Sequence, residues 1–365
     1  MNRRTIILTG VLIIIAAAIW QLGGFGGPHT GSGAADIPVS ASMPPTAAQK
    51  AARYDRAKEF VAPSGFVNAS PFTMQSLIGT HVILVDFWTY SCINCLRTLP
   101  YLKAWYAKYH DQGLEIVGVH TPEFAFEHDI ANVRAAVQKQ GIAYPVVLDN
   151  DHGTWDAYRN QYWPHEYLID VDGFIVHDHI GEGDYDTTEH AIQDALTELQ
   201  ARAGKIGTIA STVTTPPDVI PMDASKIGTP ELYLGSARNA GVMGVGIRTG
   251  IDGRQNLEIP DEKEHRDNMI YMEGPWDFTP EYTQNASASA MVHLHFTARQ
   301  VNIVAGSSSG APVHVRVWVD DKEVAPVTVT GKQLYTVFDG PDYADHDLML
   351  VIEQPGLELF TFTFG

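Results

Sequence analysis

Cysteine is scarce in this chain of 365 residues. Only Cys92 and Cys95 are cysteines, so any internal disulfide has to join these two. Cationic side chains are also few, because 24 lysines and arginines stand against 43 aspartates and glutamates, for a net charge of −19. Nucleic-acid binding relies on basic patches, and we therefore expect no nucleic-acid partner. The length, with 45% hydrophobic residues, predicts about two domains with real cores.

A long apolar run stands at the N-terminus. It covers Thr5–Leu22 and follows Arg3 and Arg4. The run comes close to spanning a membrane, and the positive residues are expected to stay in the cytoplasm. We therefore predict that residues 1–22 anchor the chain in the inner (cytoplasmic) membrane and that the catalytic part is periplasmic or extracytoplasmic. A cleaved signal peptide is the alternative, because Ala16–Ala18 supplies small residues.

The rest of the chain divides by composition and by hydrophobic period. Residues 23–57 begin with a stretch rich in Gly, Pro, Ser and Ala, which predicts a flexible tether. Residues 58–203 alternate between strand-like and helix-like segments, which predicts a sheet covered by helices on both faces. Residues 204–225 carry Gly and Pro and are predicted to be a linker. Residues 226–365 hold short alternating segments between turn residues, which predicts an all-β sandwich.

Individual elements follow from the same patterns. In the α/β part the strand candidates are Val82–Trp88, Leu114–His120, Tyr144–Leu148, Glu166–Asp170 and Phe174–His179. The helix candidates there are Cys92–Tyr109, Ile130–Gln140, Thr154–Asn160 and Thr187–Arg202. D-V-D-G at 170–173 predicts a hairpin turn, and Asp186 with Glu189 predicts a capping box for the last helix. The C-terminal strand candidates are Ala290–Phe296, Val301–Ala305, Val313–Val319, Val327–Val329, Leu348–Ile352 and Leu357–Phe362.

The two cysteines follow a buried strand and open a helix. The apolar, β-branched run Val82–Phe87 indicates the strand, and a segment of helical period begins at the first cysteine. Three residues apart on a helix, the two side chains share one face and can close a tight disulfide. Exposed N–H groups and the helix dipole favour a thiolate on Cys92. This is the arrangement of a dithiol exchange site, in which Cys92 attacks and Cys95 resolves the mixed disulfide.

Two other interpretations of C-x-x-C are open. The motif can be half of a zinc site, although the chain has no second C-x-x-C and no H-x-x-x-H nearby. It can also form an inert structural disulfide, although a loop this short adds little stability.

Residues around the cysteines resemble thioredoxin. D-F-W at Asp86–Trp88 begins six residues before Cys92, and Pro100 follows Cys95 by five residues. Far downstream, Trp163-Pro164 followed by H-E-Y-L-I-D-V-D-G resembles the cis-proline loop with its next strand and turn.

Three longer motifs resemble a particular group in this superfamily. W-T-Y-S-C-I-N-C-L-R-T-L-P at 88–100, G-V-H-T-P-E-F at 118–124 and H-I-G-E-G-D-Y-D-T-T-E at 179–189 are similar to the extracytoplasmic part of TlpA/DipZ-type proteins. In DipZ-type proteins a thioredoxin-like domain precedes a β-sandwich that resembles a carbohydrate-binding module. The expected fold is therefore an α/β thioredoxin-like domain, a jelly-roll-like β-sandwich and an N-terminal membrane anchor helix.

The resemblance implies a membrane-tethered thiol–disulfide oxidoreductase. Its expected substrates are disulfide-bearing extracytoplasmic proteins, and its expected electron donor is a membrane carrier of the DsbD/CcdA type. The redox-active Cys92–Cys95 disulfide takes the place of a cofactor, and no metal is expected. A glycan is a possible ligand of the β-sandwich.

The resemblance also implies roles for residues near the dithiol. Asp86, desolvated beneath the pair, is expected to have a raised pKa and to accept the proton of Cys95. Pro164 is expected to form a cis peptide bond facing the dithiol. The expected substrate groove consists of Trp88, Thr89, Trp163 and Glu123.

Two positions depart from the relatives. Ile93-Asn94 stands between the cysteines where thioredoxin has Gly-Pro, and this dipeptide tunes the redox potential. TlpA- and ResA-type reductases carry a glutamate in C-x-x-C-x-x-E, where this chain has Thr98. Asp86 is therefore the expected proton acceptor.

Two alternative functions stay open. T-Y-S-C at 89–92 also fits the T-x-x-C of peroxiredoxins, which predicts a thiol peroxidase. The C-terminal part can instead be a glycan- or partner-binding module with an auxiliary redox domain. Its aromatic candidates for stacking on sugars are Tyr271, Trp276, Tyr282 and Trp318.

Overall fold

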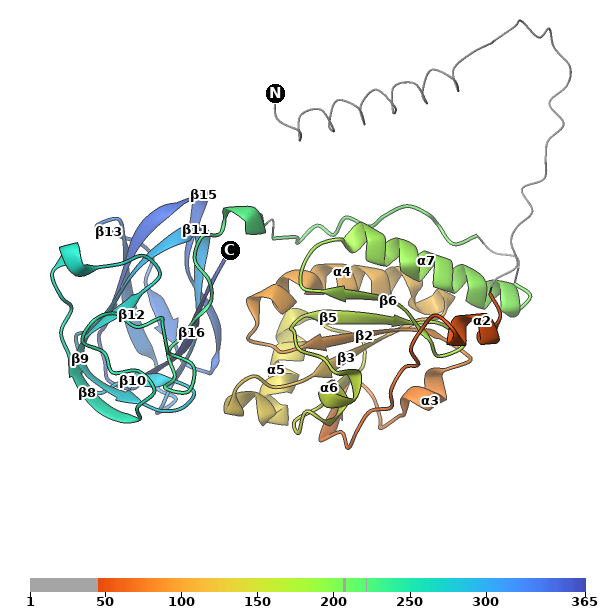
Figure 1. Ribbon diagram of the computed structural model, residues 1–365, viewed down its shortest axis with the longest axis horizontal. Helices are drawn as coiled ribbons and strands as arrows, with labels where there is room; N and C mark the ends of the chain where they lie inside the picture. The colour runs from red at the N-terminus through yellow and green to blue at the C-terminus, as the bar shows by residue number, and fades with distance from the viewer. Residues whose placement is uncertain (1–44, 206–207, 221) are drawn as a thin grey trace, which may run out of the picture. The chain divides into compact units, whose positions relative to one another are not determined.

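The computed structural model describes residues 45–205, 208–220 and 222–365 (Figure 1). The predicted anchor at 1–22 and most of the predicted tether at 23–57 lie outside these residues. None of the helices that the structure describes is long and apolar enough to cross a membrane. Residues 45–365 form one compact unit that contains two sheets.

The first sheet has six strands in the order β1-β4-β3-β2-β5-β6. Strand β2 pairs in parallel with β3 and antiparallel with β5, so it lies at the centre of the sheet. The strands are β1 (Gly65–Val67), β2 (Val82–Trp88), β3 (Leu114–His120), β4 (Val146–Leu148), β5 (His165–Ile169) and β6 (Ile175–Ile180). The predicted strands are therefore all present, within two residues at each end.

Helices cover both faces of this sheet, as the alternating pattern predicts. Leu84 of β2 packs with side chains of α4, α5 and α7, whereas Val85 packs with side chains of α3 and α6. Successive side chains of a strand point to opposite faces, so these two clusters lie on opposite faces. Figure 1 shows α4 and α7 apart from α3 and α6 across the strands. The helices are α2 (Ala47–Ala51), α3 (Met74–Leu77), α4 (Ile93–Tyr109), α5 (Ile130–Gln140), α6 (Gly153–Tyr158) and α7 (Tyr185–Arg202), with 3₁₀ turns η1 (His110–Gln112) and η2 (Ala125–His128).

The predicted capping box of the last helix is wrong. Helix α7 begins at Tyr185, and its N-cap residue Asp184 makes no side-chain capping bond. Glu189 is buried and accepts hydrogen bonds from Lys108 Nζ at 2.8 Å and from the Tyr109 hydroxyl at 2.7 Å. The Glu189 carboxylate therefore forms an ion pair with Lys108 instead of the predicted capping bond at the start of the helix.

The predicted D-V-D-G turn is confirmed. It joins the antiparallel strands β5 and β6, and Gly173 has a φ of +83°, which favours glycine. Asp170 Oδ1 accepts the Phe174 N–H at 2.9 Å and fixes the turn from inside.

The second sheet region is all-β, as predicted. Two long strands, β11 and β15, pair antiparallel and contribute buried side chains to the apolar cluster of this region. Residues Ala290–Phe296 and Val301–Ala305, predicted as two strands, belong to the single strand β11, and register shifts around Gln300 explain the break in their pattern. The strands are β7 (Leu232–Tyr233), β8 (Gly253–Leu257), β9 (Ile270–Phe278), β10 (Thr283–Asn285), β11 (Ala290–Ser307), β12 (Val313–Val319), β13 (Lys322–Glu323), β14 (Val327–Val329), β15 (Gln333–Ile352) and β16 (Leu357–Phe364), with 3₁₀ turns η3 (Ala224–Lys226) and η4 (Glu262–Glu264). The finer likeness to a carbohydrate-binding sandwich stays a prediction.

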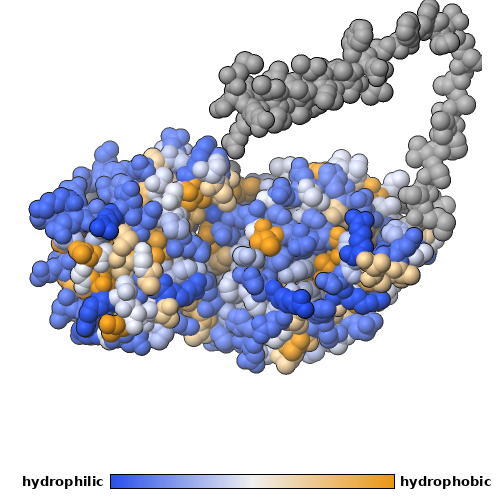
Figure 2. Space-filling model, in the orientation of Figure 1, coloured by the Kyte–Doolittle hydropathy of each residue, from blue (hydrophilic) through white to orange (hydrophobic). Residues whose placement is uncertain are grey.

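Two of the four aromatic side chains predicted to stack on sugars are buried, and the other two are partly buried. Tyr271 and Trp276 are 2% and 0% exposed and belong to the interior of the second sheet region. Tyr282 packs against Phe360. Trp318 is half-buried beside Arg316. Polar side chains cover most of the face drawn in Figure 2, and the hydrophobic ones there are scattered.

Candidate active site

The dithiol lies where the central strand passes into the longest helix of the first sheet region. Strand β2 ends at Trp88, and Cys92 is the N-cap residue of α4. The Sγ atom of Cys92 accepts the backbone N–H of Cys95 at 3.4 Å. Both cysteines are free thiols; Cys92 is partly exposed and Cys95 is 1% exposed. One sulfur therefore faces the surface and the other faces the interior.

Asp86 lies in the interior beneath this helix start. It has the same strand parity as Leu84 and Trp88, so its side chain points to the face that α4 covers. Burial raises the pKa of Asp86 to about 7, and its Oδ1 has no hydrogen-bond partner among the described residues. Burial, then Cys92, then Asp86 raise the pKa of the Cys95 thiol well above its usual value. Asp86 and Cys95 therefore interact electrostatically inside the protein.

A second buried carboxyl lies beside Asp86, and the sequence analysis missed it. Glu166 of β5 stands directly opposite Asp86 in the antiparallel register, so both side chains lie on one face of the sheet. Both Glu166 oxygens lack a hydrogen-bond partner in the described part of the chain. Burial and the neighbouring Asp86 raise the pKa of Glu166 well above its usual value. Among the described residues no cation forms an ion pair with either carboxyl, so the two are expected to share protons rather than ionise together.

A tyrosine closes this buried group. The Tyr144 hydroxyl is buried and has no hydrogen-bond partner among the residues described. Burial raises the pKa of Tyr144, and the charges of Asp86, Glu166 and Cys95 raise it further. Tyr144 therefore lies near enough to all three groups to be affected by their charges. We call Asp86, Glu166, Tyr144 and Cys95 the buried acid cluster.

Trp88 lies in the core and not in a groove. It is fully buried, and its indole ring packs edge-on against His120 at a centroid distance of 5.4 Å. A Cβ atom added to Gly118 of β3 would meet the Trp88 Nε1 at 2.8 Å, so glycine allows the ring this close to the sheet. The predicted groove position of Trp88 is therefore not found.

Thr89 also points inward. It is fully buried, and its hydroxyl lies 3.4 Å from His120 Nε2. Burial lowers the pKa of His120 to about 3, so this imidazole stays neutral. Thr89 is absent from the walls of the pocket that holds Cys92.

Two of the predicted groove residues do meet Cys92. Trp163 and Glu123 line the same pocket of about 60 Å³ as Cys92. The Trp163–Pro164 peptide bond is cis, as the motif predicts. The Trp163 Nε1–H donates to the Thr121 carbonyl at 3.1 Å, which fixes the ring beside the loop that carries Glu123.

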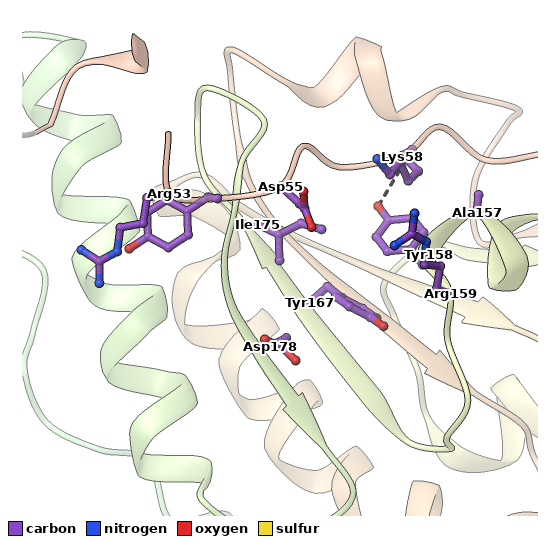
Figure 3. Close-up of a pocket in the computed structure, with 10 residues that line it drawn as sticks. Arg53, Asp55, Lys58, Ala157, Tyr158, Arg159, Tyr167, Ile175 and Asp178 are labelled. Carbon is purple, nitrogen blue, oxygen red and sulfur yellow. Dashed lines mark hydrogen bonds between the residues drawn. The ribbon is translucent and has the colours of Figure 1, made fainter. Parts of the chain in front are cut away.

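A separate cavity of about 430 Å³ contains none of the predicted site residues. Its walls come from Arg53 to Lys58, from Tyr158 and Arg159 and from β5 and β6, and the Tyr158 hydroxyl donates to the Lys58 carbonyl at 3.2 Å (Figure 3). The dithiol chemistry therefore belongs to the smaller pocket.

Comparisons with known proteins agree with this geometry. Residues 54–178 match the model of the AhpC/TSA family, and residues 229–365 match the model of a thioredoxin like C-terminal domain. Protein DipZ of Mycobacterium bovis is 35% identical over 305 residues, which cover 83% of this chain and 42% of that protein. The chain thus spans less than half the length of that relative.

A shorter relative matches over most of its own length. The thiol-disulfide oxidoreductase YkuV of Bacillus subtilis is 30% identical over 128 residues, which cover 35% of this chain and 86% of YkuV. Among solved structures, a thioredoxin-like protein in the oxidized form is 27% identical with a TM-score of 0.37, covering 40% of this chain and 97% of that one. By its sequence relatives and its buried dithiol, this chain belongs to the thioredoxin-like thiol–disulfide oxidoreductases.

Proposed function

We propose that this oxidoreductase works as a reductase of disulfides in extracytoplasmic proteins. The observation that carries the proposal is the pairing of a partly exposed thiol, Cys92, with a buried thiol, Cys95, above the buried acid cluster. The exposed sulfur is placed to attack a substrate, and the buried sulfur is placed to resolve the product.

The reaction is a two-step exchange. The Cys92 thiolate attacks one sulfur of the substrate disulfide, the S–S bond breaks, and a mixed disulfide forms while the first substrate thiolate leaves. Cys95 then gives its proton to Asp86 and attacks the Cys92 sulfur. The second substrate thiolate leaves, and the protein is left in its oxidised form with a Cys92–Cys95 disulfide. Two electrons pass to the substrate, whose thiolates take up two protons.

Asp86 is suited to the proton transfer by its environment. A general base works best when its pKa lies near the working pH, and the pKa of Asp86 is about 7. Because two neighbouring buried carboxylates repel each other, Asp86 and Glu166 do not both ionise, and one proton stays within the cluster.

The charges around the dithiol support the reducing direction. A strongly oxidising couple needs a stabilised reduced form. The raised pKa of Cys95 keeps that thiol protonated, and the ionisable groups that line the pocket with Cys92 are the carboxyls of Glu123 and Glu231 together with Tyr233. No lysine, arginine or histidine lines this pocket in the described part of the chain. None of the described lining residues therefore carries a positive charge that would stabilise a negatively charged dithiol.

Recharging requires an electron donor outside these 365 residues. The 365 residues contain no third cysteine, so the oxidised pair has to receive electrons from outside. We propose a membrane electron carrier of the DsbD/CcdA type as the donor. This partner, the anchor at residues 1–22 and the extracytoplasmic location rest on the apolar N-terminal run and on the resemblance to DipZ-type proteins.

The structure favours neither alternative function. A peroxidase of the T-x-x-C type would use the hydroxyl of Thr89 beside Cys92, but this hydroxyl contacts His120 in the interior. Sugar stacking would use exposed rings, but Tyr271 and Trp276 are buried.

The two cysteines test the proposal in opposite ways. With the full chain, we expect Cys92→Ser to abolish reduction of a protein disulfide such as that of insulin. We expect Cys95→Ser to accumulate a mixed disulfide with substrate, visible by mass spectrometry and released by dithiothreitol. A Cys92→Ser variant that still reduces insulin would overturn the proposal, and so would a Cys95→Ser variant that turns over at the wild-type rate.

A further inference from the structure

The exposed thiol opens into a pocket that two parts of the chain build together. The first sheet region supplies half of the lining, namely Ser91, Cys92, Asn94, Glu123 and Trp163. The second sheet region and the segment before it supply the other half, namely Glu231, Tyr233, Val304, Thr361 and Thr363. We call the second group the C-terminal wall.

An aromatic contact holds the two regions together beside the pocket. Phe124 and Phe126, in the loop and 3₁₀ turn after β3, pack against Phe360 of β16 at centroid distances of 5.1 and 4.9 Å. Phe124 and Phe360 are both almost fully buried, and Val304 belongs to the same apolar cluster. Burial of this kind contributes about 25 cal/mol per Å² of apolar surface, so the cluster favours contact between the regions.

Hydrogen bonds continue the contact on the polar side. Glu123 Oε1 accepts from the Tyr233 hydroxyl and from Arg238 Nη1, each at 2.8 Å. The Glu281 carboxylate accepts the Ala125 N–H at 3.1 Å. From helix α4, Arg97 Nη2 donates to the Gln300 side chain at 3.3 Å. Both the loop after β3 and helix α4 therefore contact the second sheet region.

The loop that makes these contacts is tied directly to the dithiol. Ser91, the residue before Cys92, donates its hydroxyl to Glu127 Oε1 at 2.6 Å. The other oxygen of Glu127 accepts the N–H groups of Glu123 at 2.6 Å and of Phe124 at 3.0 Å. The fully buried Glu127 thus fixes the position of the contact loop relative to the nucleophile.

One side chain of the C-terminal wall has an unused hydrogen-bonding group. Thr363 is 3% exposed, and its hydroxyl has no partner among the described residues. Buried hydroxyls usually have a partner, and an unpartnered one costs about 1–3 kcal/mol. The hydroxyl belongs to a residue that lines the Cys92 pocket, where a ligand or a leaving thiolate can accept from it.

The pocket is small. Its volume of about 60 Å³ is far below the about 430 Å³ of the separate cavity beside Lys58. A sulfur atom with its attached methylene fits such a space, whereas the surface of a folded protein around a disulfide does not.

We propose that the C-terminal wall is part of the substrate site and selects sterically unhindered disulfides, those on flexible segments of extracytoplasmic proteins or on slender molecules. This inference rests on the proposed function and names its substrate class. While the two regions are in contact, Cys92 attacks the small disulfide, one thiol leaves as the mixed disulfide forms, and Cys95 releases the second thiol. A disulfide on a folded surface reaches Cys92 only when the contact at Phe360 opens.

The test compares two substrates on the full chain. Rapid-mixing kinetics give the rate constants with which the reduced protein reacts with hydroxyethyl disulfide, a slender substrate, and with insulin, a protein disulfide. In Phe360→Ser the aromatic contact is lost. We expect the insulin rate constant to rise at least about tenfold, equivalent to about 1.4 kcal/mol, whereas the hydroxyethyl disulfide rate constant should not rise.

A second variant and a control guard against misfolding. Arg238→Glu places a carboxylate against Glu123 at the outer edge of the contact, and we expect the insulin rate to rise in the same direction by a smaller factor. Trp318→Ser makes a similar large-to-small change on β12, where the ring lies beside Arg316. We expect it to leave both rates unchanged, and circular dichroism checks the fold of each variant.

The outcomes separate this inference from the proposed function. If the wild type reduces neither substrate, the proposed function fails. If it reduces both and neither Phe360→Ser nor Arg238→Glu raises the insulin rate, the reductase function stands and the size selection is overturned. An equal rise in Trp318→Ser would also overturn it, because the effect would then not come from the contact.

Discussion

The two cysteines lie one helical turn apart in opposite surroundings. Cys92 faces a narrow pocket with Glu123, Trp163 and the C-terminal wall, whereas Cys95 faces Asp86 and the rest of the buried acid cluster. The pocket controls which disulfides reach the first sulfur. The cluster controls when the second sulfur can lose its proton. Access and proton transfer are therefore set by different parts of the fold, and each can be changed separately.

The largest expected effect comes from Asp86 in the buried acid cluster, and it is an effect on the free energy of unfolding. The folded-state pKa of Asp86, about 7, lies above its ordinary value of 3.8, so the folded protein binds more protons than the unfolded one between these values. The free energy of unfolding therefore falls as pH rises from about 4 to about 7. The difference corresponds to about 4 kcal/mol. We expect Asp86→Asn to be more stable than wild type above pH 7, by up to this amount.

Denaturant unfolding of the oxidised protein at pH 4, 6 and 8 measures this effect without titration of free thiols. The stabilisation by Asp86→Asn should grow with pH and level off above about 7. Asp194→Asn, an exposed change on α7, serves as the control and should show no such trend. A pH-independent difference between Asp86→Asn and wild type would contradict the buried, protonated state of Asp86.

The same substitution should slow the second step of the exchange. Loss of a positioned general base costs about 10²-fold or more in the catalysed step. We expect Asp86→Asn to lower the rate at which Cys95 resolves a preformed mixed disulfide by about that factor at pH 7. The first attack by Cys92 should change much less. Quenched-flow separation of the two steps checks this, and equal slowing of both would contradict the division of roles.

Glu166 should have a smaller effect on the same step. Glu166→Gln removes the second carboxyl that shares protons with Asp86, so the raised pKa of the pair that Glu166 contributes should be lost. We expect the pH profile of the resolving step to move to lower pH, with a rate change of about tenfold or less at its plateau. Rescue of the wild-type profile is expected in Glu166→Asp if that side chain reaches Asp86. An unchanged profile in Glu166→Gln would remove Glu166 from the cluster.

The smallest effect is expected from Thr363, in the pocket that holds Cys92. Thr363→Val keeps the shape of the side chain and removes only the unpartnered hydroxyl. We expect reduction of hydroxyethyl disulfide to slow by about threefold to tenfold, the loss of one hydrogen bond of about 1 kcal/mol in the transition state. The resolving step of a preformed mixed disulfide should show no change in its pH profile. A wild-type rate in Thr363→Val would mean that this hydroxyl does not contact the substrate.

Local patterns predicted the residues that belong to one continuous stretch. Cys92, Cys95 and Asp86 stand on a strand and a helix that adjoin in sequence, and the motif after Trp163 predicted the cis bond at Pro164. Strand bounds were off by one or two residues where proline intervenes, as at β4, because proline lacks the N–H that a ladder needs.

The local patterns did not predict contacts between residues that are distant in sequence. Glu166 lies 80 residues from Asp86, and only the antiparallel register of β5 with β2 brings the two carboxyls together. The alternation of Glu166 with Leu168 on a buried strand was an available signal for it. The resemblance predicts Trp88 in the groove, but strand parity directs its side chain into the core. Nothing local indicates which surface the C-terminal strands would meet.

The most direct test of the account is the equilibrium reduction potential of the Cys92–Cys95 pair in the full chain, measured against glutathione and dithiothreitol buffers. With Cys95 held protonated and no basic group beside Cys92 among the described lining residues, the account predicts a reducing couple near that of thioredoxin, about −270 mV. A value near that of DsbA, about −120 mV, would mean that the protein installs disulfides, and it would contradict the proposed direction of electron flow.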